Sequence, residues 1–119
     1  MLKTKSIQKR AFQTDGIRIC TMRRIKPEFV FDIWIPLLSP STQLLESYHA
    51  NTVSWEEFEN LLHKELFPKQ DAILTMIADL SNKTTVTLLC WEKTPEKCHR
   101  RLLAEEILTR FPDMERKIA

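Results

Sequence analysis

The stretch that decides the fold runs from Thr84 to Phe111, and its centre reads Leu88-Leu89-Cys90-Trp91-Glu92-Lys93-Thr94-Pro95-Glu96-Lys97-Cys98-His99-Arg100. Residues 85–91 are rich in β-branched and aliphatic side chains and almost free of charge, which predicts a strand buried on both faces. A hydroxyl residue, a proline and a carboxylate follow at 94–96, the pattern of a helix start. Beyond them, apolar residues recur at helical spacing and predict a helix that ends near residue 111.

The preceding part of the chain carries strand signals first and helix signals second. Residues 3–12 and 16–24 are expected to be extended and joined through a tight turn at Gly16, the single glycine. Residues 29–35 form a second dense apolar run, either a strand or a packed loop.

Three helices are expected in the middle of the chain. The first begins at the hydroxyl–proline pattern of residues 39–42. The second begins with a capping box, ends before Pro68 and carries an apolar stripe of Trp55, Phe58, Leu62 and Leu66. The third carries Ile73, Met76, Ile77 and Leu80. This order of elements predicts an α/β fold class: a single compact domain over residues 1–119, with a small, partly parallel sheet flanked by helices.

Length and composition exclude several classes of protein. The 119 residues suffice for one domain with a hydrophobic core, and 43% hydrophobic with 29% charged residues is an ordinary globular composition. One glycine is too few for a glycine-rich phosphate loop. No apolar run approaches the ~20 residues of a membrane span, and residues 1–5 are not followed by the apolar core of a signal peptide. Three cysteines, an odd number, favour a reducing, cytoplasmic setting.

The net charge of +2 conceals an uneven distribution. Residues 1–26 hold eight basic side chains against Asp15 alone, whereas acidic side chains outnumber basic ones in the remainder. A basic amino-terminal block can indicate an anionic partner such as a nucleic acid or a phosphorylated ligand. It can equally indicate strands whose lysine-rich outer faces discourage pairing with other chains.

Reactive side chains gather where the predicted strand meets the predicted helix: Cys90, Glu92, Cys98, His99 and Arg100. On a strand that continues past Trp91, Cys90 and Glu92 project to the same side. Arg100 falls on the inward stripe of the helix, and a buried guanidinium needs either Glu92 or a bound anion as its partner. The free N–H groups of a helix start also favour an anion or a thiolate.

Four interpretations of this cluster remain open. Both cysteines can be core residues, with Glu92 paired to Arg100. A thiol enzyme would use Cys90 or Cys98 as nucleophile and His99 or Glu92 as base, although Cys98 and His99 diverge by ~100° as neighbours on a helix. A binding pocket for a phosphate, nucleotide or nucleic-acid end would use Arg23 and Arg100. A metal or redox site is the fourth, but the separation of the cysteines exceeds the usual metal-ligand spacing.

We therefore expect a pocket for an anion at the carboxyl end of strand 85–91, faced by Arg23. Arg23 and Arg100 would bind the ligand, no metal or cofactor is expected, and the catalytic candidates are Cys90, Glu92, Cys98 and His99. The partner would be an anionic small molecule or a nucleic acid. A thiol-dependent enzyme is the first hypothesis, and a non-catalytic binding module that uses the basic amino-terminal strands is the second.

The chain resembles the YeaO-like branch of the family known as domain of unknown function 488. The resemblance spans roughly residues 14–108 and is carried by 15–19, 39–44 and 55–58, and above all by Cys90-Trp91-Glu92-Lys93 with Pro95, Cys98, His99 and Arg100. These last residues match a C-x-E-x-x-P-x-x-C-H-R signature of small cysteine-containing members. The chain departs from the YeaO-like pattern at Met22, where an acidic residue is usual. The resemblance implies a compact α/β fold and the location of a site.

Overall fold

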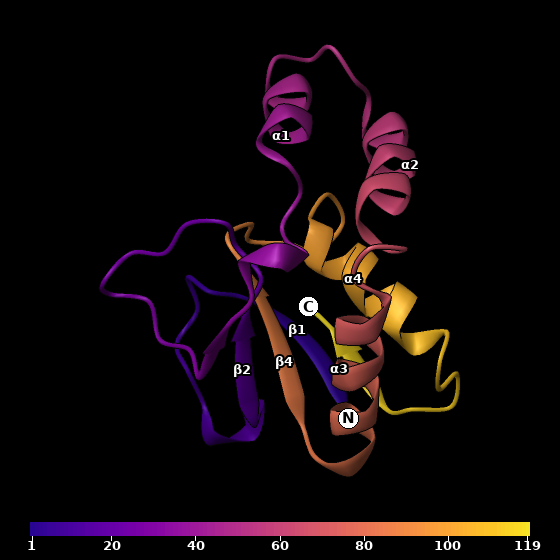
Figure 1. The fold of residues 1–119 in the computed structure, drawn as a ribbon. Coiled ribbons are helices and arrows are strands. Elements are labelled where there is room, and N and C mark those ends of the chain that lie inside the picture. The colour runs from indigo at the N-terminus through magenta and orange to yellow at the C-terminus, as the bar shows by residue number, and fades with distance from the viewer.

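Five strands pair side by side in the order β3-β2-β4-β1-β5, and every pairing is parallel in the computed structural model, which describes residues 1–119 (Figure 1). The strands are β1 (Leu2–Ser6), β2 (Ile17–Cys20), β3 (Ile33–Trp34), β4 (Val86–Cys90) and β5 (Arg116–Ile118). The predicted α/β class is confirmed, with a sheet that is parallel throughout rather than in part.

The central strand β4 is buried on both faces, as its composition predicts, because all five of its residues are buried. Val86 and Leu88 point into the main hydrophobic core with the helices. Leu89 points the other way and packs with Ile7 and Cys20 beneath the loops that follow β1 and β2. Parallel strands flanked on both faces need this continuous apolar composition.

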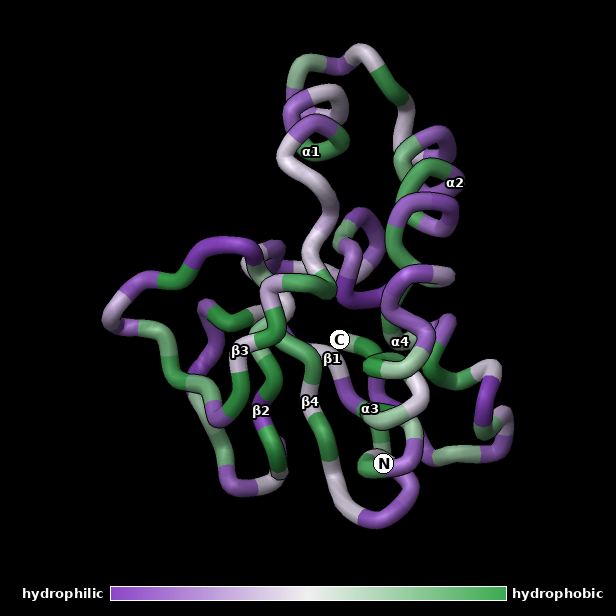
Figure 2. Tube along the Cα trace, viewed as in Figure 1, coloured by the Kyte–Doolittle hydropathy of each residue, from purple (hydrophilic) through white to green (hydrophobic).

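Four helices complete the fold: α1 (Thr42–His49), α2 (Trp55–Leu66), α3 (Asp71–Lys83) and α4 (His99–Leu108), with short 3-10 turns at Gln13–Asp15 and Pro36–Leu38. Helices α3 and α4 contact each other, β1 and β4, whereas α1 and α2 pair as an arm that stands beyond one end of the sheet (Figure 1). Figure 2 shows hydrophobic residues along β4 and alternating with hydrophilic ones along β2 and the helices, whereas the loops carry both kinds. None of the helices combines the length and the apolar composition needed to cross a bilayer.

The second helix agrees closely with its sequence pattern. Ser54 and Glu57 form the predicted capping box, and Phe58, Leu62 and Leu66 are buried. On α3, by contrast, the stripe is displaced by one position: Leu74, Ile77 and Ala78 are buried, and Met76 is half exposed.

The tight turn expected at Gly16 is present as a 3-10 turn that ends there, but the two strands it joins are not neighbours. β4 inserts between them and pairs in parallel with both. Gly16 also allows a close crossing: its φ is 65°, and a Cβ there would lie 2.1 Å from the carbonyl oxygen of Thr85. The helix expected at residues 94–96 begins later, since α4 has Cys98 as its N-cap, and of residues 29–35 only Ile33–Trp34 form a strand.

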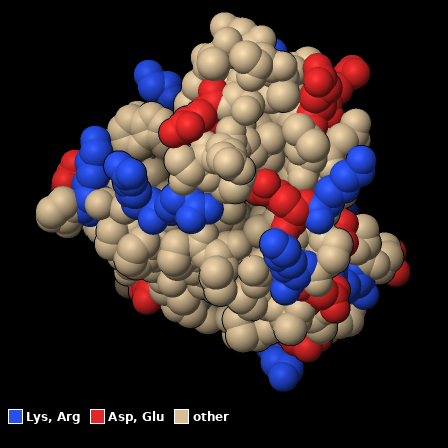
Figure 3. Space-filling view, turned by 45° about the horizontal axis from the view of Figure 1, so that its top comes forward, with Lys and Arg blue, Asp and Glu red and all other residues tan.

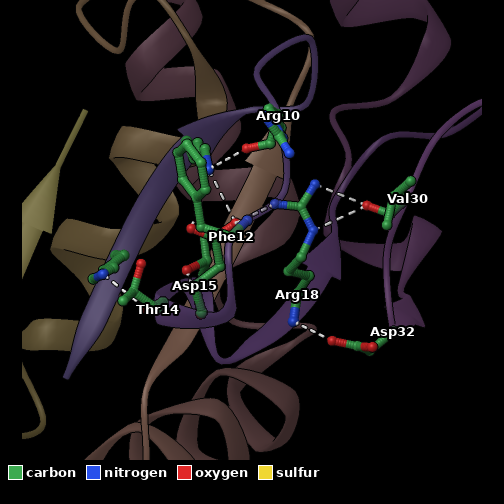
Figure 4. Close-up of polar contacts among 10 residues, drawn as sticks. Arg10, Phe12, Thr14, Asp15, Arg18, Val30 and Asp32 are labelled. Atoms are coloured by element: carbon green, nitrogen blue, oxygen red, sulfur yellow. Dashed lines mark hydrogen bonds and ion pairs between the residues drawn. The ribbon is translucent and has the colours of Figure 1, made fainter.

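Buried charges secure the loop-covered face of the sheet (Figure 4). The Asp15 carboxylate accepts hydrogen bonds from Arg18 Nη1 at 2.5 Å, from Lys5 Nζ at 3.0 Å and from the Phe12 backbone N–H at 3.0 Å. Arg18 also donates from Nε and Nη2 to the carbonyl oxygen of Val30. Burial alone would raise the pKa of Asp15, but these hydrogen bonds outweigh it and hold the pKa below its usual value.

Replacing Asp15 with Asn should lower the free energy of unfolding by about 3 kcal/mol, because Lys5 and Arg18 would lose their only carboxylate. Chemical denaturation measures this, with Asp79→Asn as the control, since Asp79 is exposed on α3 and forms no ion pair. The stabilisation by Asp15 is complete above the pKa of an unfolded aspartate, ~4, and is lost as pH falls through the lower folded pKa. Equal stability of the two variants at neutral pH would contradict this role.

Candidate functional site

A cavity of about 500 Å³ lies at the carboxyl ends of β2 and β4, next to the α1–α2 arm. Its lining brings together Cys90, Cys98 and His99 with the cationic side chains of Arg23, Arg24 and Lys97. Aromatic side chains of the arm, Tyr48 and Trp55 among them, line another part. Seen from this end, the molecule carries basic side chains on both sides of a small acidic group (Figure 3). Ligands of parallel α/β sheets bind at this edge, because the strand ends leave their loops free there.

The central contact of the cavity joins the last residue of β4 to the first residue of α4. Cys90 Sγ lies 3.3 Å from His99 Nδ1, and both residues are buried, with 6% and 8% of their surface exposed. The segment between them, residues 91–98, forms bends and turns, so the contact closes a loop between strand and helix. A thiol beside an imidazole is the arrangement that activates a cysteine nucleophile.

The contacts of Nε2 show which ring nitrogen of His99 carries the hydrogen in the neutral ring. Nε2 lies 2.9 Å from the carbonyl oxygen of Thr21, which can only accept, and 3.1 Å from Thr21 Oγ1. The Thr21 hydroxyl donates its own hydrogen to the carbonyl oxygen of Leu89 at 2.8 Å. Nε2 must therefore carry a hydrogen, which leaves Nδ1 of the neutral ring free to accept the proton of Cys90.

The two cysteines of the cavity have opposite acidities. The neighbouring Cys98 thiol, which can donate to the Cys90 sulfur, lowers the pKa of Cys90, and the Trp91 backbone N–H and the Arg100 charge act in the same direction against the effect of burial. The same pairing with Cys90, together with burial, raises the pKa of Cys98 to about 12. Cys90 is therefore the cysteine that ionises first, and Cys98 stays protonated at neutral pH.

Arg100 is fully buried, as the helical spacing predicts, but its partners differ from the expected ones. Its guanidinium donates to the main-chain oxygens of Glu92 at 2.8 Å and Ala119 at 3.1 Å, and to Cys98 Sγ at 3.2 Å. Nη2 has no hydrogen-bond partner, and no side-chain carboxylate forms an ion pair with this cation. A buried cation is unfavourable without negative charge nearby, and a thiolate at the adjacent cysteines would supply it.

Of the other predicted site residues, Arg23 and Glu92 line the cavity and Arg100 does not. Arg23 lines the cavity, where its Nη2 donates to the carbonyl oxygen of Pro40 at 2.8 Å. Glu92 also lines the cavity, but it is exposed, and its carboxylate does not pair with Arg100. The predicted alignment of Glu92 with Cys90 required a longer strand, whereas β4 ends at Cys90. Arg100 itself is not part of the cavity surface and lies beneath it.

Several of the amino-terminal basic residues are engaged inside the protein. Lys5 and Arg18 bind Asp15, and Lys3 donates to the carbonyl oxygen of Thr14. Lys9, Arg10 and the residues 23–26 on the loop after β2 remain exposed. The basic surface available to a partner is therefore carried by loops rather than by the strands.

The ligating atoms of Cys90, Cys98 and His99 lie within 4.8 Å of one another, close enough for one ion to contact all three. Two thiolates and an imidazole suit zinc. The Arg100 guanidinium, however, already donates to Cys98 Sγ and brings a positive charge to the place of an ion. These contacts fit a thiol and thiolate pair better than a metal centre, and we assign no metal here.

Thr21 was not among the residues expected from the sequence. Its carbonyl and hydroxyl oxygens orient His99, and it immediately follows β2 at the edge where the ligand is expected. A threonine at the carboxyl end of a predicted parallel strand was the only available signal.

Replacing Arg100 with Met should raise the pKa of Cys90, because the guanidinium charge favours its thiolate. The thiolate absorbance measured against pH, in a background without Cys20, would report the change. Arg101→Met is the matched control, since Arg101 forms ion pairs with Glu59 and Glu105 instead. Identical titration curves for the two variants would show that Arg100 does not act on Cys90.

Comparison with known proteins supports the relationship that the site residues indicate. A family model described as the active DUF488-N3 subclade matches residues 2–111. The uncharacterized protein YeaO of Escherichia coli strain K12 is 28% identical over 109 residues, which cover 87% of this chain and 94% of YeaO. No solved structure matches the chain. Since the family model spans nearly the whole chain, from β1 to the residues that follow α4, the protein belongs to the DUF488 family and is YeaO-like.

Proposed function

We propose that the protein is a thiol-dependent enzyme in which Cys90 is the nucleophile and His99 its base, acting on a small anionic molecule in the cavity. The observation that carries this proposal is the contact of 3.3 Å between Cys90 Sγ and His99 Nδ1, with Nε2 of the same ring held by Thr21. The matched family model is described as an active subclade, which agrees with a catalytic role.

The roles of the three residues follow from their contacts. Cys90 transfers its proton to Nδ1 of His99 and attacks an electrophilic atom of the substrate as a thiolate. Thr21 holds the ring in the orientation and tautomer that this transfer requires. The buried charge of Arg100 favours the thiolate from below, and it does so without touching the substrate.

The cavity supplies the preference for an anion. Arg23, Arg24 and Lys97 outnumber the carboxylates of Glu46 and Glu92 on its lining. Its volume of about 500 Å³ falls within the usual range for small-molecule sites, ~300–1,000 Å³. Glu92 also lines this cavity, where its carboxylate can accept a hydrogen bond from a ligand.

Alkylation with iodoacetamide, followed residue by residue with mass spectrometry, tests the nucleophile. Cys90 should react near neutral pH with an apparent pKa below that of an ordinary thiol, and His99→Gln should raise this pKa or slow the reaction. Burial raises the pKa of Cys20, so Cys20 should react only in more alkaline solution and serves as the internal control. If neither Cys90 nor Cys98 reacts faster than a free thiol near pH 7, the nucleophile role is wrong.

Two alkylating agents that differ in charge test the preference for anions. The ratio of the rates with iodoacetate and iodoacetamide at Cys90 should exceed the ratio for a peptide thiol, and it should fall with added salt. Replacing Arg23 and Arg24 together with Gln should lower the ratio several-fold, whereas Lys9→Gln, outside the cavity lining, should leave it unchanged. A ratio equal to that of the peptide would remove the anion from the proposal.

A second candidate function is nucleic-acid binding, favoured by the exposed basic residues that have no carboxylate partner: Lys9, Arg10, Arg23, Arg24 and Lys26. Affinity for a single-stranded or duplex oligonucleotide should then fall steeply with salt and with removal of these charges. Absence of binding at low salt would leave the enzyme as the better description.

A further inference from the structure

A second thiol stands beside the proposed nucleophile and has no part in the mechanism above. Cys98 Sγ lies within 4.8 Å of Cys90 Sγ, and Cys98 is 2% exposed. It lines the same cavity and accepts a hydrogen bond from Arg100 Nη1. A core cysteine needs neither a position at the cavity nor a cationic donor.

The backbone around Cys98 allows the two sulfur atoms to meet. Cys98 is the N-cap of α4 and has extended dihedral angles, φ −136° and ψ 139°, so it is not held within a helical turn. Residues 91–97 before it contain no regular element. We expect movement of this segment, rather than of β4 or α4, to bring the sulfurs from within 4.8 Å to bonding distance.

We propose that Cys90 and Cys98 form a redox-active dithiol that passes two electrons to a small anionic disulfide bound in the cavity. This inference rests on the proposed function, since Cys90 is again the nucleophile, and it assigns a reaction and a substrate class to the same site. Cationic lining residues would hold the carboxylates of the disulfide, and the buried sulfurs would meet its sulfur–sulfur bond.

The reaction balances in two exchanges. The Cys90 thiolate attacks one sulfur of the substrate, a mixed disulfide forms, and the first thiolate product leaves with the proton held by His99. Cys98 then gives up its proton and attacks Cys90 Sγ, the mixed disulfide breaks, and the second thiolate leaves with that proton. The protein ends as the Cys90–Cys98 disulfide, the substrate as two thiols.

Arg100 moderates the reducing power of this dithiol. In the reduced protein the guanidinium charge favours the Cys90 thiolate, whereas the disulfide carries no charge for it to stabilise. Stabilising the thiolate of the reduced protein makes formation of the disulfide less favourable, so the dithiol is a mild reductant. Arg100→Met should therefore shift the equilibrium toward the disulfide, by about tenfold for each pKa unit that Arg100 contributes.

The test exposes the reduced, folded full-length chain to two small disulfides of opposite charge. Dithiodiglycolate is the anionic one and cystamine the cationic one. Mass spectrometry should show the loss of two hydrogens and a peptide bridge between Cys90 and Cys98, formed faster with the anionic disulfide. Cys98→Ser should stop at the mixed disulfide on Cys90, and Cys98→Ala serves as a second variant whose fold is checked by circular dichroism. Cys20→Ser is the control and should behave as the wild type, because Cys20 lies on the opposite face of the sheet.

Three outcomes would overturn the dithiol. The first is a Cys98→Ser protein that reacts like the wild type. The second is the formation of disulfides only between two protein chains. The third is tight binding of zinc by the reduced protein. Failure is separable from that of the proposed function: a Cys90 that alkylates as expected and yet forms no bridge removes only the dithiol. A Cys90 that does neither removes both proposals.

Discussion

A single buried cation dictates the arrangement around the site. Arg100 enters the protein interior without a side-chain carboxylate as its partner, and main-chain oxygens from two separate segments converge on it. The oxygen of Glu92 fixes the loop that leaves β4, and the oxygen of Ala119 fixes the segment that follows β5. The start of α4 is thereby held against the end of β4, and the His99 ring lies beside the Cys90 thiol. An aliphatic residue at this position would leave these oxygens without the guanidinium that joins the segments.

The two faces of the sheet divide the tasks of stability and chemistry. Helices α3 and α4 bury the large core on one face, while the other face is closed by loops and by the Asp15 ion pairs. The cavity with Cys90 and His99 forms at the carboxyl edge, where β2 and β4 end together and the α1–α2 arm stands over them. Rigid strands thus present Thr21 and Cys90, and an irregular loop carries the remaining groups.

Local features of the fold could be predicted from the sequence, and pairings across distance could not. The burial of β4, the capping box of α2 and the inward direction of Arg100 all follow from residues close together in the chain. The turn at Gly16 did not indicate which strands pair, because alternation identifies a strand without naming its neighbour, and a strand from the distant half of the chain lies between the two that the turn joins. The helix start at 94–96 was wrong because hydroxyl and proline residues also stabilise turns.

At the site, the sequence located the cluster but not its internal contacts. The pairing of His99 with Cys90 depends on the shape of the intervening loop, which has no periodic pattern to read. The expected partner of Arg100 was a side chain, and its actual partners are main-chain oxygens, which every residue possesses and no sequence pattern marks. Thr21 acts largely through its carbonyl group for the same reason.

The order of strands in the sheet has a consequence for how the protein is made. Leu2 lies opposite Val86 on one side and Arg116 on the other, and Ile17 also lies opposite Val86. During synthesis, both early strands leave the ribosome long before the central strand that joins them exists. The edges of β1 and β2 can pair, and their apolar side chains can be buried, only after most of the chain has been made. Such long-range pairing gives the fold a high contact order, which favours slow folding. Until β4 is made, the nascent amino-terminal half therefore exposes unpaired strand edges, which are prone to aggregate.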